Sequence, residues 1–210
     1  MFSFLVLKSL QITKWIEIYL KSISSLRICL INLDMKVLFL DIDGVLNSEN
    51  WFAYRIYCVK NNMFNILMNF VDTDDRNIKH KLTMLDDRAI ANLNRIVEET
   101  GCKVVLSSSW RSSIESENIF TQNLLKLKGF KYEFYDVTPR LWFSDFSIRR
   151  GEEIKFWLDK ESEKHEIESF VILDDDSDML PEQMNKFIPV DGQVGLTDRD
   201  VLAAIEILNR

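Results

Sequence analysis

Residues 36–48, KVLFLDIDGVLNS, contain the most informative pattern of the chain. Its apolar residues 37–40 predict a buried strand, which runs directly into Asp41 and Asp43. Side chains alternate between the two faces of a strand, so these two aspartates would point the same way if the strand continued. Two neighbouring carboxylates repel each other unless a cation lies between them. The stretch therefore predicts a metal ion at the end of this strand.

Downstream of this strand, short apolar runs alternate with helical patterns. Strands are expected at residues 36–42, 103–108, 131–138, 169–174 and 186–191. Helices are expected at residues 83–100, 114–128, 150–164 and 196–210, and residues 48–83 are expected to form a mostly helical insertion. Such alternation implies a parallel sheet covered by helices on both faces. The sequence therefore predicts a three-layer α/β, Rossmann-like domain with a small insertion after its first strand.

Three single residues are expected to mark the ends and edges of these elements. Gly101 follows the helix at 83–100 in the position of a C-cap. Thr197 precedes the last helix as an N-cap. Pro189 cannot donate a backbone hydrogen bond, so the strand that contains it is predicted to lie at an edge of the sheet.

Polar side chains follow three of the predicted strands at the point where each strand ends. Asp41 and Asp43 follow the first strand, serines 107–109 follow the second, and aspartates 174–176 follow the fourth. In open α/β sheets, ligands bind in the crevice beyond the carboxyl ends of the strands. The carboxylates and hydroxyls are therefore predicted to converge on one crevice.

Composition limits the classes of protein that fit the chain. The 210 residues carry a net charge of -7, with 47% hydrophobic and 28% charged residues, which is typical of a folded globular domain. The acidity argues against a broad nucleic-acid surface, because phosphate binding needs clustered Lys and Arg. The three cysteines, Cys29, Cys58 and Cys102, show no paired spacing, so we expect neither a disulfide framework nor a zinc site. We therefore expect a cytoplasmic setting.

Residues 1–34 are apolar but charged residues interrupt every run, so no transmembrane span is expected there. No basic region precedes the first apolar run, which argues against a signal peptide. Two interpretations remain. The segment is either an amphipathic helix docked on the domain, a partner or a membrane surface, or an extension upstream of a natural start at Met35. We favour the second and expect one domain over residues 35–210.

Two other phosphate- or metal-binding patterns fail. An EF-hand beginning at Asp174 would have Met179 in place of the required Gly and Asn185 in place of the required Glu. The chain also lacks the GxxxxGK[ST] pattern of a P-loop.

Four segments in order, FLDIDGVL, VVLSSSWR, RGEEIKFWL and VILDDDSDM, resemble the four motifs of the haloacid dehalogenase (HAD) superfamily. The resemblance is closest to the HAD domain named after Swiss Army Knife RNA repair proteins. It covers about residues 36–207, and its specificity lies in the order and spacing of the motifs, because DxDG alone is a weak signal.

The resemblance implies a role for each motif. Asp41 would attack phosphorus as the nucleophile, and Asp43 would act as general acid and base. Ser107 would bind phosphate oxygens at the end of the second motif. A Mg²⁺ ion would be held by Asp41, the backbone carbonyl of Asp43, Asp174 and Asp175, with Asp178 reaching it through a water.

The cation of the third motif and the leaving-group contacts are less defined. Arg150 is the best match for the cation, with Arg149 and Lys155 as alternatives. Arg111 would bind a second phosphate or the leaving group, or pair with a surface acid. Ser108 would contact substrate or, with Ser109, cap the next helix. Trp110 is expected to pack under the sheet edge, with stacking on a base as the alternative.

These features predict a magnesium-dependent phosphomonoester hydrolase that works through an aspartyl-phosphate on Asp41. By resemblance the substrate would be a nucleotide or an RNA-end phosphate, and small sugar or metabolite phosphates remain open. Two other classes are weighed: a catalytically silent HAD scaffold that serves as a binding module, and a two-component receiver domain. A receiver would carry its phosphorylated aspartate on a later strand and would lack the DxDG pattern.

Overall fold

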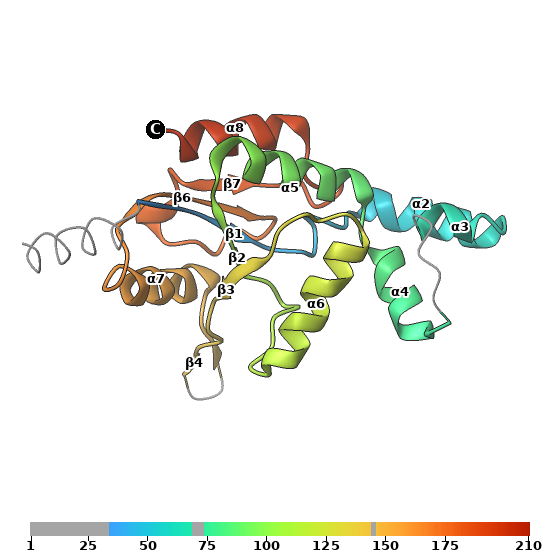
Figure 1. Ribbon diagram of the computed structural model, residues 1–210, viewed down its shortest axis with the longest axis horizontal. Helices are drawn as coiled ribbons and strands as arrows, with labels where there is room; N and C mark the ends of the chain where they lie inside the picture. The colour runs from blue at the N-terminus through green and yellow to red at the C-terminus, as the bar shows by residue number, and fades with distance from the viewer. Residues whose placement is uncertain (1–33, 69–73, 144–145) are drawn as a thin grey trace, which may run out of the picture.

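The computed structural model describes residues 34–68, 74–143 and 146–210. Five parallel strands form the central sheet in the order β3-β2-β1-β6-β7 (Figure 1). Their bounds are Met35–Leu40 for β1, Lys103–Leu106 for β2, Phe134–Val137 for β3, Ile167–Asp174 for β6 and Phe187–Pro189 for β7. The predicted three-layer α/β fold is confirmed, and Pro189 lies on an edge strand as expected. Predictions for residues 1–33, including the amphipathic helix and Cys29, lie outside the described residues.

The alternation of side chains along β1 explains why both faces of the sheet are covered. Leu38 and Leu40 contribute to one buried cluster, whereas Val37 and Phe39 contribute to the other, and all four are fully buried. A strand that is apolar on both faces is stable only between two layers of helices. Strand β1 therefore lies at the centre of the molecule.

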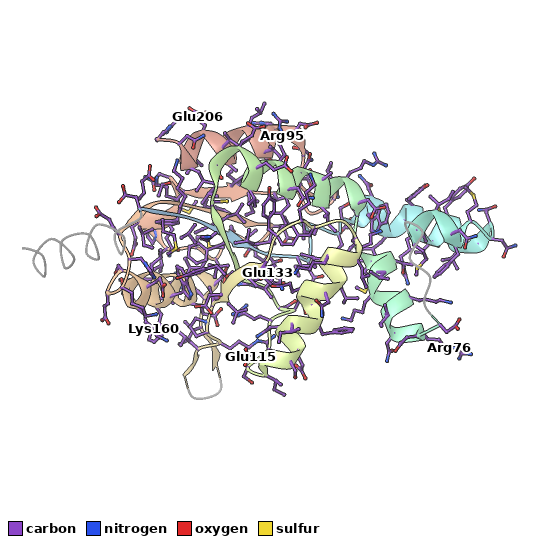
Figure 2. The ribbon with its side chains drawn as sticks, viewed as in Figure 1. Arg76, Arg95, Glu115, Glu133, Lys160 and Glu206 are labelled. Atoms are coloured by element: carbon purple, nitrogen blue, oxygen red, sulfur yellow. The ribbon has the colours of Figure 1, made fainter. Side chains whose placement is uncertain are left out.

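Helices complete the two outer layers. Helices α5, Asp87–Thr100, and α8, Asp198–Leu208, cover one face, and α7, Arg150–Glu161, covers the other (Figure 1). Helix α6, Glu115–Leu127, follows β2 and places Leu124 and Leu125 in the same cluster as α5. Charged side chains such as Arg95 on α5 and Glu206 on α8 point outward from these layers (Figure 2). None of the described helices has the length and apolarity needed to cross a membrane.

The insertion after β1 is helical, as predicted. It contains α2, Glu49–Lys60, α3, Phe64–Leu67, and α4, Arg76–Met84, and it extends from one end of the molecule (Figure 1). The indole N–H of Trp51 donates to the carbonyl of Thr83 at 3.0 Å and so ties α2 to the end of α4. The buried ammonium of Lys128 joins the insertion to the main domain, because it pairs with Asp87 and donates to the carbonyl of Leu67 at 3.1 Å.

One prediction of local structure was wrong, and one pair of strands was not predicted. The helix expected from residue 83 onward is two helices, because Asp86 has extended backbone angles and its side chain accepts a hydrogen bond from the amide of Arg88 as the N-cap of α5. A two-stranded antiparallel hairpin of β4, Trp142–Phe143, and β5, Phe146–Ser147, was not predicted. Strands of two residues are too short to show a periodic pattern.

Other expectations hold. Gly101 ends α5 with φ +68°, and the carboxylate of Asp200 accepts hydrogen bonds from the amide and hydroxyl of Thr197 at the start of α8. Cys58 and Cys102 are free thiols and are buried.

Candidate active site

Two adjacent strands bring three carboxylates together. Leu40 of β1 pairs with Leu173 of β6, and the amide of Asp41 donates to the carbonyl of Leu173 at 2.9 Å. Asp41 and Asp174 therefore leave the sheet side by side. One carboxylate oxygen from each of Asp41, Asp174 and Asp175 lies within 4.8 Å of the others, which is compact enough to hold one metal ion.

Arg150 supplies the positive charge at this cluster. Its Nη1 lies 3.3 Å from Oδ1 of Asp41 and 3.9 Å from Oδ2 of Asp174. The arginine stands at the first position of α7, and its amide donates to the carboxylate of Asp178 at 2.9 Å. Asp178 therefore fixes the start of the helix that carries Arg150, while its predicted contact with a metal through water stays a prediction.

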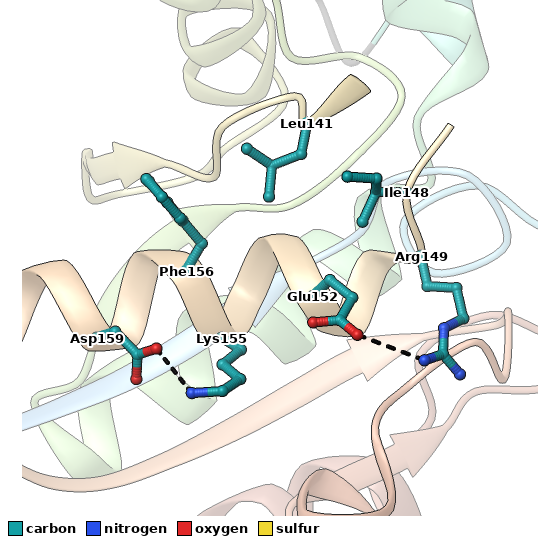
Figure 3. Close-up of a pocket in the computed structure, with 7 residues that line it drawn as sticks. All are labelled: Leu141, Ile148, Arg149, Glu152, Lys155, Phe156 and Asp159. Atoms are coloured by element: carbon teal, nitrogen blue, oxygen red, sulfur yellow. Dashed lines mark hydrogen bonds and ion pairs between the residues drawn. The ribbon is translucent and has the colours of Figure 1, made fainter. Parts of the chain in front are cut away.

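The other two candidates for the cation lie elsewhere. Arg149 pairs with Glu152 at 3.4 Å, and Lys155 pairs with Asp159 at 2.7 Å, both along the exposed side of α7 (Figure 3). Among the three basic residues considered, Arg150 is the one that contacts Asp41.

Burial changes the proton affinity of the cluster. It raises the pKa of Asp41 to about 6, although the nearby Arg150 and a hydrogen bond from Ser108 act in the opposite direction. Burial, together with the charge of Asp41, raises the pKa of Asp174 to about 7, although Arg150 acts in the opposite direction. Oδ2 of Asp174 is buried without a hydrogen-bond partner among the described residues. A divalent cation would satisfy this oxygen and neutralise its neighbours, so the residues fit Mg²⁺.

Asp175 reaches the cluster because two glycines leave room for it. Gly44 has φ +71°, and a Cβ added there would lie 2.2 Å from the Cγ of Asp175. A Cβ at Gly192 would lie 2.8 Å from Oδ2 of the same carboxylate. Both the backbone conformation and the close approach therefore require glycine at position 44.

Asp43 has surroundings of its own. Strand β1 ends at Leu40, so the alternation that would have paired Asp41 with Asp43 does not apply. The carboxylate of Asp43 accepts from Nδ2 of Asn47 at 3.0 Å, Oγ of Ser109 at 2.8 Å and Nε1 of Trp110 at 2.9 Å. The carboxylate of Asp43 is thus held by three neutral donors, whereas that of Asp41 lies beside Arg150 and the other acids. A ligand role for the backbone carbonyl of Asp43 stays a prediction.

The three serines after β2 have different environments. The hydroxyl of Ser107 lies 3.3 Å from that of Thr138 and is buried. Ser108 is fully buried, and its hydroxyl accepts from the amides of Ile42 and Trp110, each at 3.3 Å. Ser109 is exposed. Ser108 therefore holds the backbone beside Asp41, and the substrate contact predicted for Ser108 and the phosphate contact predicted for Ser107 stay predictions.

Arg111 is buried and forms an ion pair, and its predicted contact with substrate stays a prediction. Of the two predicted alternatives, the ion pair is present, but its partner Glu153 is a buried acid and not a surface acid. Nη1 of Arg111 also donates to the carbonyl of Ser108 at 2.6 Å, and burial lowers the pKa of the guanidinium. The pair therefore links the backbone at Ser108 to that at Leu141, because Glu153 also accepts from the amide of Leu141 at 3.0 Å.

The contacts of Asn47, Ser109 and Trp110 with Asp43 were not predicted. Trp110 does pack against the core, as expected, but its indole edge also faces the carboxylate. The signal was present in the run SSSW directly after an apolar strand, but assigning a partner required the fold of the loop.

The central strand ends in an aspartate, the neighbouring strand ends in two more, and a helix supplies an arginine. This arrangement on a Rossmann-like sheet is typical of a HAD-type hydrolase. Residues 37–201 match the family described as the HAD domain in Swiss Army Knife RNA repair proteins, and the chain belongs to this family. No curated protein and no solved structure matches the chain.

Proposed function

We propose that the protein is a magnesium-dependent phosphomonoester hydrolase that acts through an aspartyl-phosphate on Asp41. The observation that carries the proposal is the setting of Asp41. Its carboxylate lies 3.3 Å from the guanidinium of Arg150 and within 4.8 Å of Asp174 and Asp175, while Asp43 is held separately by three donors. This separation gives the two aspartates different tasks.

In the first step, an oxygen of the Asp41 carboxylate forms a bond to phosphorus and the ester P–O bond breaks. Asp43 donates its proton to the departing alcohol oxygen, so a neutral alcohol leaves. In the second step, Asp43 accepts a proton from water, the water oxygen attacks phosphorus, and the bond to Asp41 breaks. Inorganic phosphate leaves and both carboxylates return to their starting states.

Arg150 has the geometry to assist both steps. Its guanidinium stands beside the attacking carboxylate, where it favours the ionised form of Asp41. The same positive charge would stabilise the equatorial oxygens of a phosphoryl group as it transfers.

The metal ligands would be the side chains of Asp41, Asp174 and Asp175. When bound, Mg²⁺ supplies positive charge that neutralises the phosphate and the acid cluster. The buried oxygen of Asp174 that accepts no hydrogen bond among the described residues supports this assignment.

The family's description names RNA repair, which favours a phosphate on a nucleotide or RNA end as the substrate. Small sugar or metabolite phosphates remain the alternative. Steady turnover of p-nitrophenyl phosphate with Mg²⁺ tests the activity itself, because a receiver domain would at most label itself and a silent scaffold would do nothing. A panel of phosphate esters that includes 3′-phosphorylated RNA then ranks the substrates by kcat/KM.

A further inference from the structure

Two pockets adjoin the candidate active site and share three lining residues, Ser109, Arg111 and Arg140. The smaller pocket, of about 280 Å³, extends from these residues to Arg150. The larger one, of about 490 Å³, extends in the other direction to Lys81. The two pockets therefore form a path from Arg150, which lies beside Asp41, to Lys81 on the insertion.

Arg140 is fixed in place but not neutralised. One of its terminal nitrogens donates to the carbonyls of Ser109 at 2.6 Å and Arg111 at 2.7 Å. A guanidinium has five N–H groups, so three remain for another acceptor. No carboxylate of the described residues pairs with Arg140, and the side chain is exposed. A fixed guanidinium with free donors is well suited to bind a phosphate.

Lys81 stands at the far end of the path. Its Nζ lies 4.3 Å from the centre of the Trp110 ring, and within the described ranges it has no ion pair. Glu117 is the carboxylate that lines the larger pocket, so Lys81 and Arg140 outnumber it. By contrast, Arg111 and Arg150 are already paired with Glu153 and Asp41. The uncompensated positive charge is thus local, in a chain whose net charge is -7.

The larger pocket lies on the side of the proton donor. Ser109 and Trp110 line it, and both donate hydrogen bonds to Asp43. In the proposed reaction the departing oxygen takes its proton from Asp43. The leaving group therefore extends from Asp43 into the space that Arg140 and Lys81 line.

We propose that the leaving alcohol of the substrate carries a second phosphate group, which Arg140 and Lys81 bind. The inference rests on the proposed function and deepens it, because it defines the substrate as a phosphomonoester with a further phosphate on its alcohol part. A nucleoside bisphosphate, an oligonucleotide end and a sugar bisphosphate all share this chemistry.

Equilibrium binding tests the inference without turnover. The Asp41→Asn protein, with excess Mg²⁺, is titrated by calorimetry with two matched pairs of compounds. The pairs are adenosine 3′,5′-bisphosphate with adenosine 3′-monophosphate, and fructose 1,6-bisphosphate with fructose 6-phosphate. We expect a bisphosphate to bind at least about tenfold more tightly than its monophosphate, as expected for hydrogen bonds to a charged group. A preference in one pair alone identifies that pair as the source of the ligand, and equal affinity within both pairs overturns the inference.

Variants locate the second site. Lys81→Gln in the Asp41→Asn background should remove about tenfold of the bisphosphate preference, and Arg140→Lys should retain more of it than Arg140→Gln. Lys79→Gln removes the same charge from the same helix outside the pocket, and the preference should persist. Equal losses in Lys79→Gln and Lys81→Gln would show a general charge effect and would overturn the site.

Steady-state kinetics of proteins that retain Asp41 distinguish this inference from the proposed function. The ratio of kcat/KM for the bisphosphate to kcat/KM for p-nitrophenyl phosphate should fall about tenfold in Lys81→Gln. If no phosphate ester is hydrolysed, the proposed function fails and the binding preference still decides the second site. If p-nitrophenyl phosphate is hydrolysed but no bisphosphate is preferred, the second site alone fails.

Discussion

Asp41 and Asp43 are two positions apart, yet one carboxylate lies among acids and Arg150 and the other among neutral donors. Asp41→Asn should abolish turnover, because an amide cannot readily form the acyl phosphate. Asp43→Asn should slow turnover by about 10²–10⁴-fold, because it removes the proton donor. The measurement is the initial rate with p-nitrophenyl phosphate at saturating Mg²⁺. An active Asp41→Asn protein would exclude the mechanism, and far-UV circular dichroism checks that an inactive variant is folded.

The raised pKa values of Asp41 and Asp174 make the metal-free protein sensitive to pH. Both exceed the ordinary value of 3.8, at about 6 and about 7, so the folded state holds more protons than the unfolded chain across this range. The contribution of these groups to the free energy of unfolding is therefore largest below pH 3.8 and is lost as the pH rises through about 7.

Asp174→Asn removes one of these titrating groups. Its melting temperature without metal should fall less between pH 5 and pH 8 than that of the parent, with a shift of about 2–4 °C for each kcal/mol. Calorimetric melts in a chelator give the comparison, and Asp159→Asn, at an exposed pair on α7, is the control. Mg²⁺ added at pH 8 should stabilise the parent more than Asp174→Asn. Parallel pH curves for the two proteins would contradict this account.

At the scale of an element, the turn after β1 shapes the metal site through Gly44. Gly44→Ala places a side chain at a positive φ, which costs about 1–2 kcal/mol, and also displaces the carboxylate of Asp175. The Mg²⁺ concentration for half-maximal rate should therefore rise, as it should in Asp175→Asn, and excess Mg²⁺ should partly restore both.

Gly101→Ala is the matched control for that turn. Gly101 has φ +68°, similar to Gly44, but an added Cβ would meet nothing within 4 Å. Gly101→Ala should lose only the stability that the positive φ costs, while its Mg²⁺ dependence stays that of the parent. If Mg²⁺ dependence changes in the control, or does not change in Gly44→Ala, the turn at Gly44 does not shape the metal site in the way proposed.

At the scale of the whole molecule, Lys128 joins the insertion to the domain. Its fully buried ammonium pairs with Asp87 and bonds to the carbonyl of Leu67. Lys128→Met should lower the free energy of unfolding by about 1–3 kcal/mol, because it leaves these acceptors without their donor. Urea unfolding measures the loss. Lys126→Met, which removes an exposed pair two positions away in the last turn of α6, should stay within about 0.5 kcal/mol of the parent.

How much of the molecule could be predicted from sequence depended on how far apart along the chain the interacting residues are. The strands, their parallel arrangement and the acids at their ends follow from local patterns, so Asp41 and Asp174 were identified. The partners of Asp43 and Arg111 were not, because the first depends on how a loop folds back and the second on a glutamate 42 positions away. Whether Arg150 or a neighbour reaches the site was likewise decided by the position of α7.

The pairing of β1 with β6 sets the order in which a growing chain can complete its active site. Leu40 and Leu173 are 133 positions apart (173 − 40), so β1 cannot pair with β6 until most of the chain has been synthesised. Contacts this distant in sequence make folding slow, because the loop must close before they form. A nascent chain that stops before Asp174 would lack an acid of the site and would leave one edge of its central strand open to other chains. Chaperones that shield this edge during translation should therefore raise the yield of folded protein.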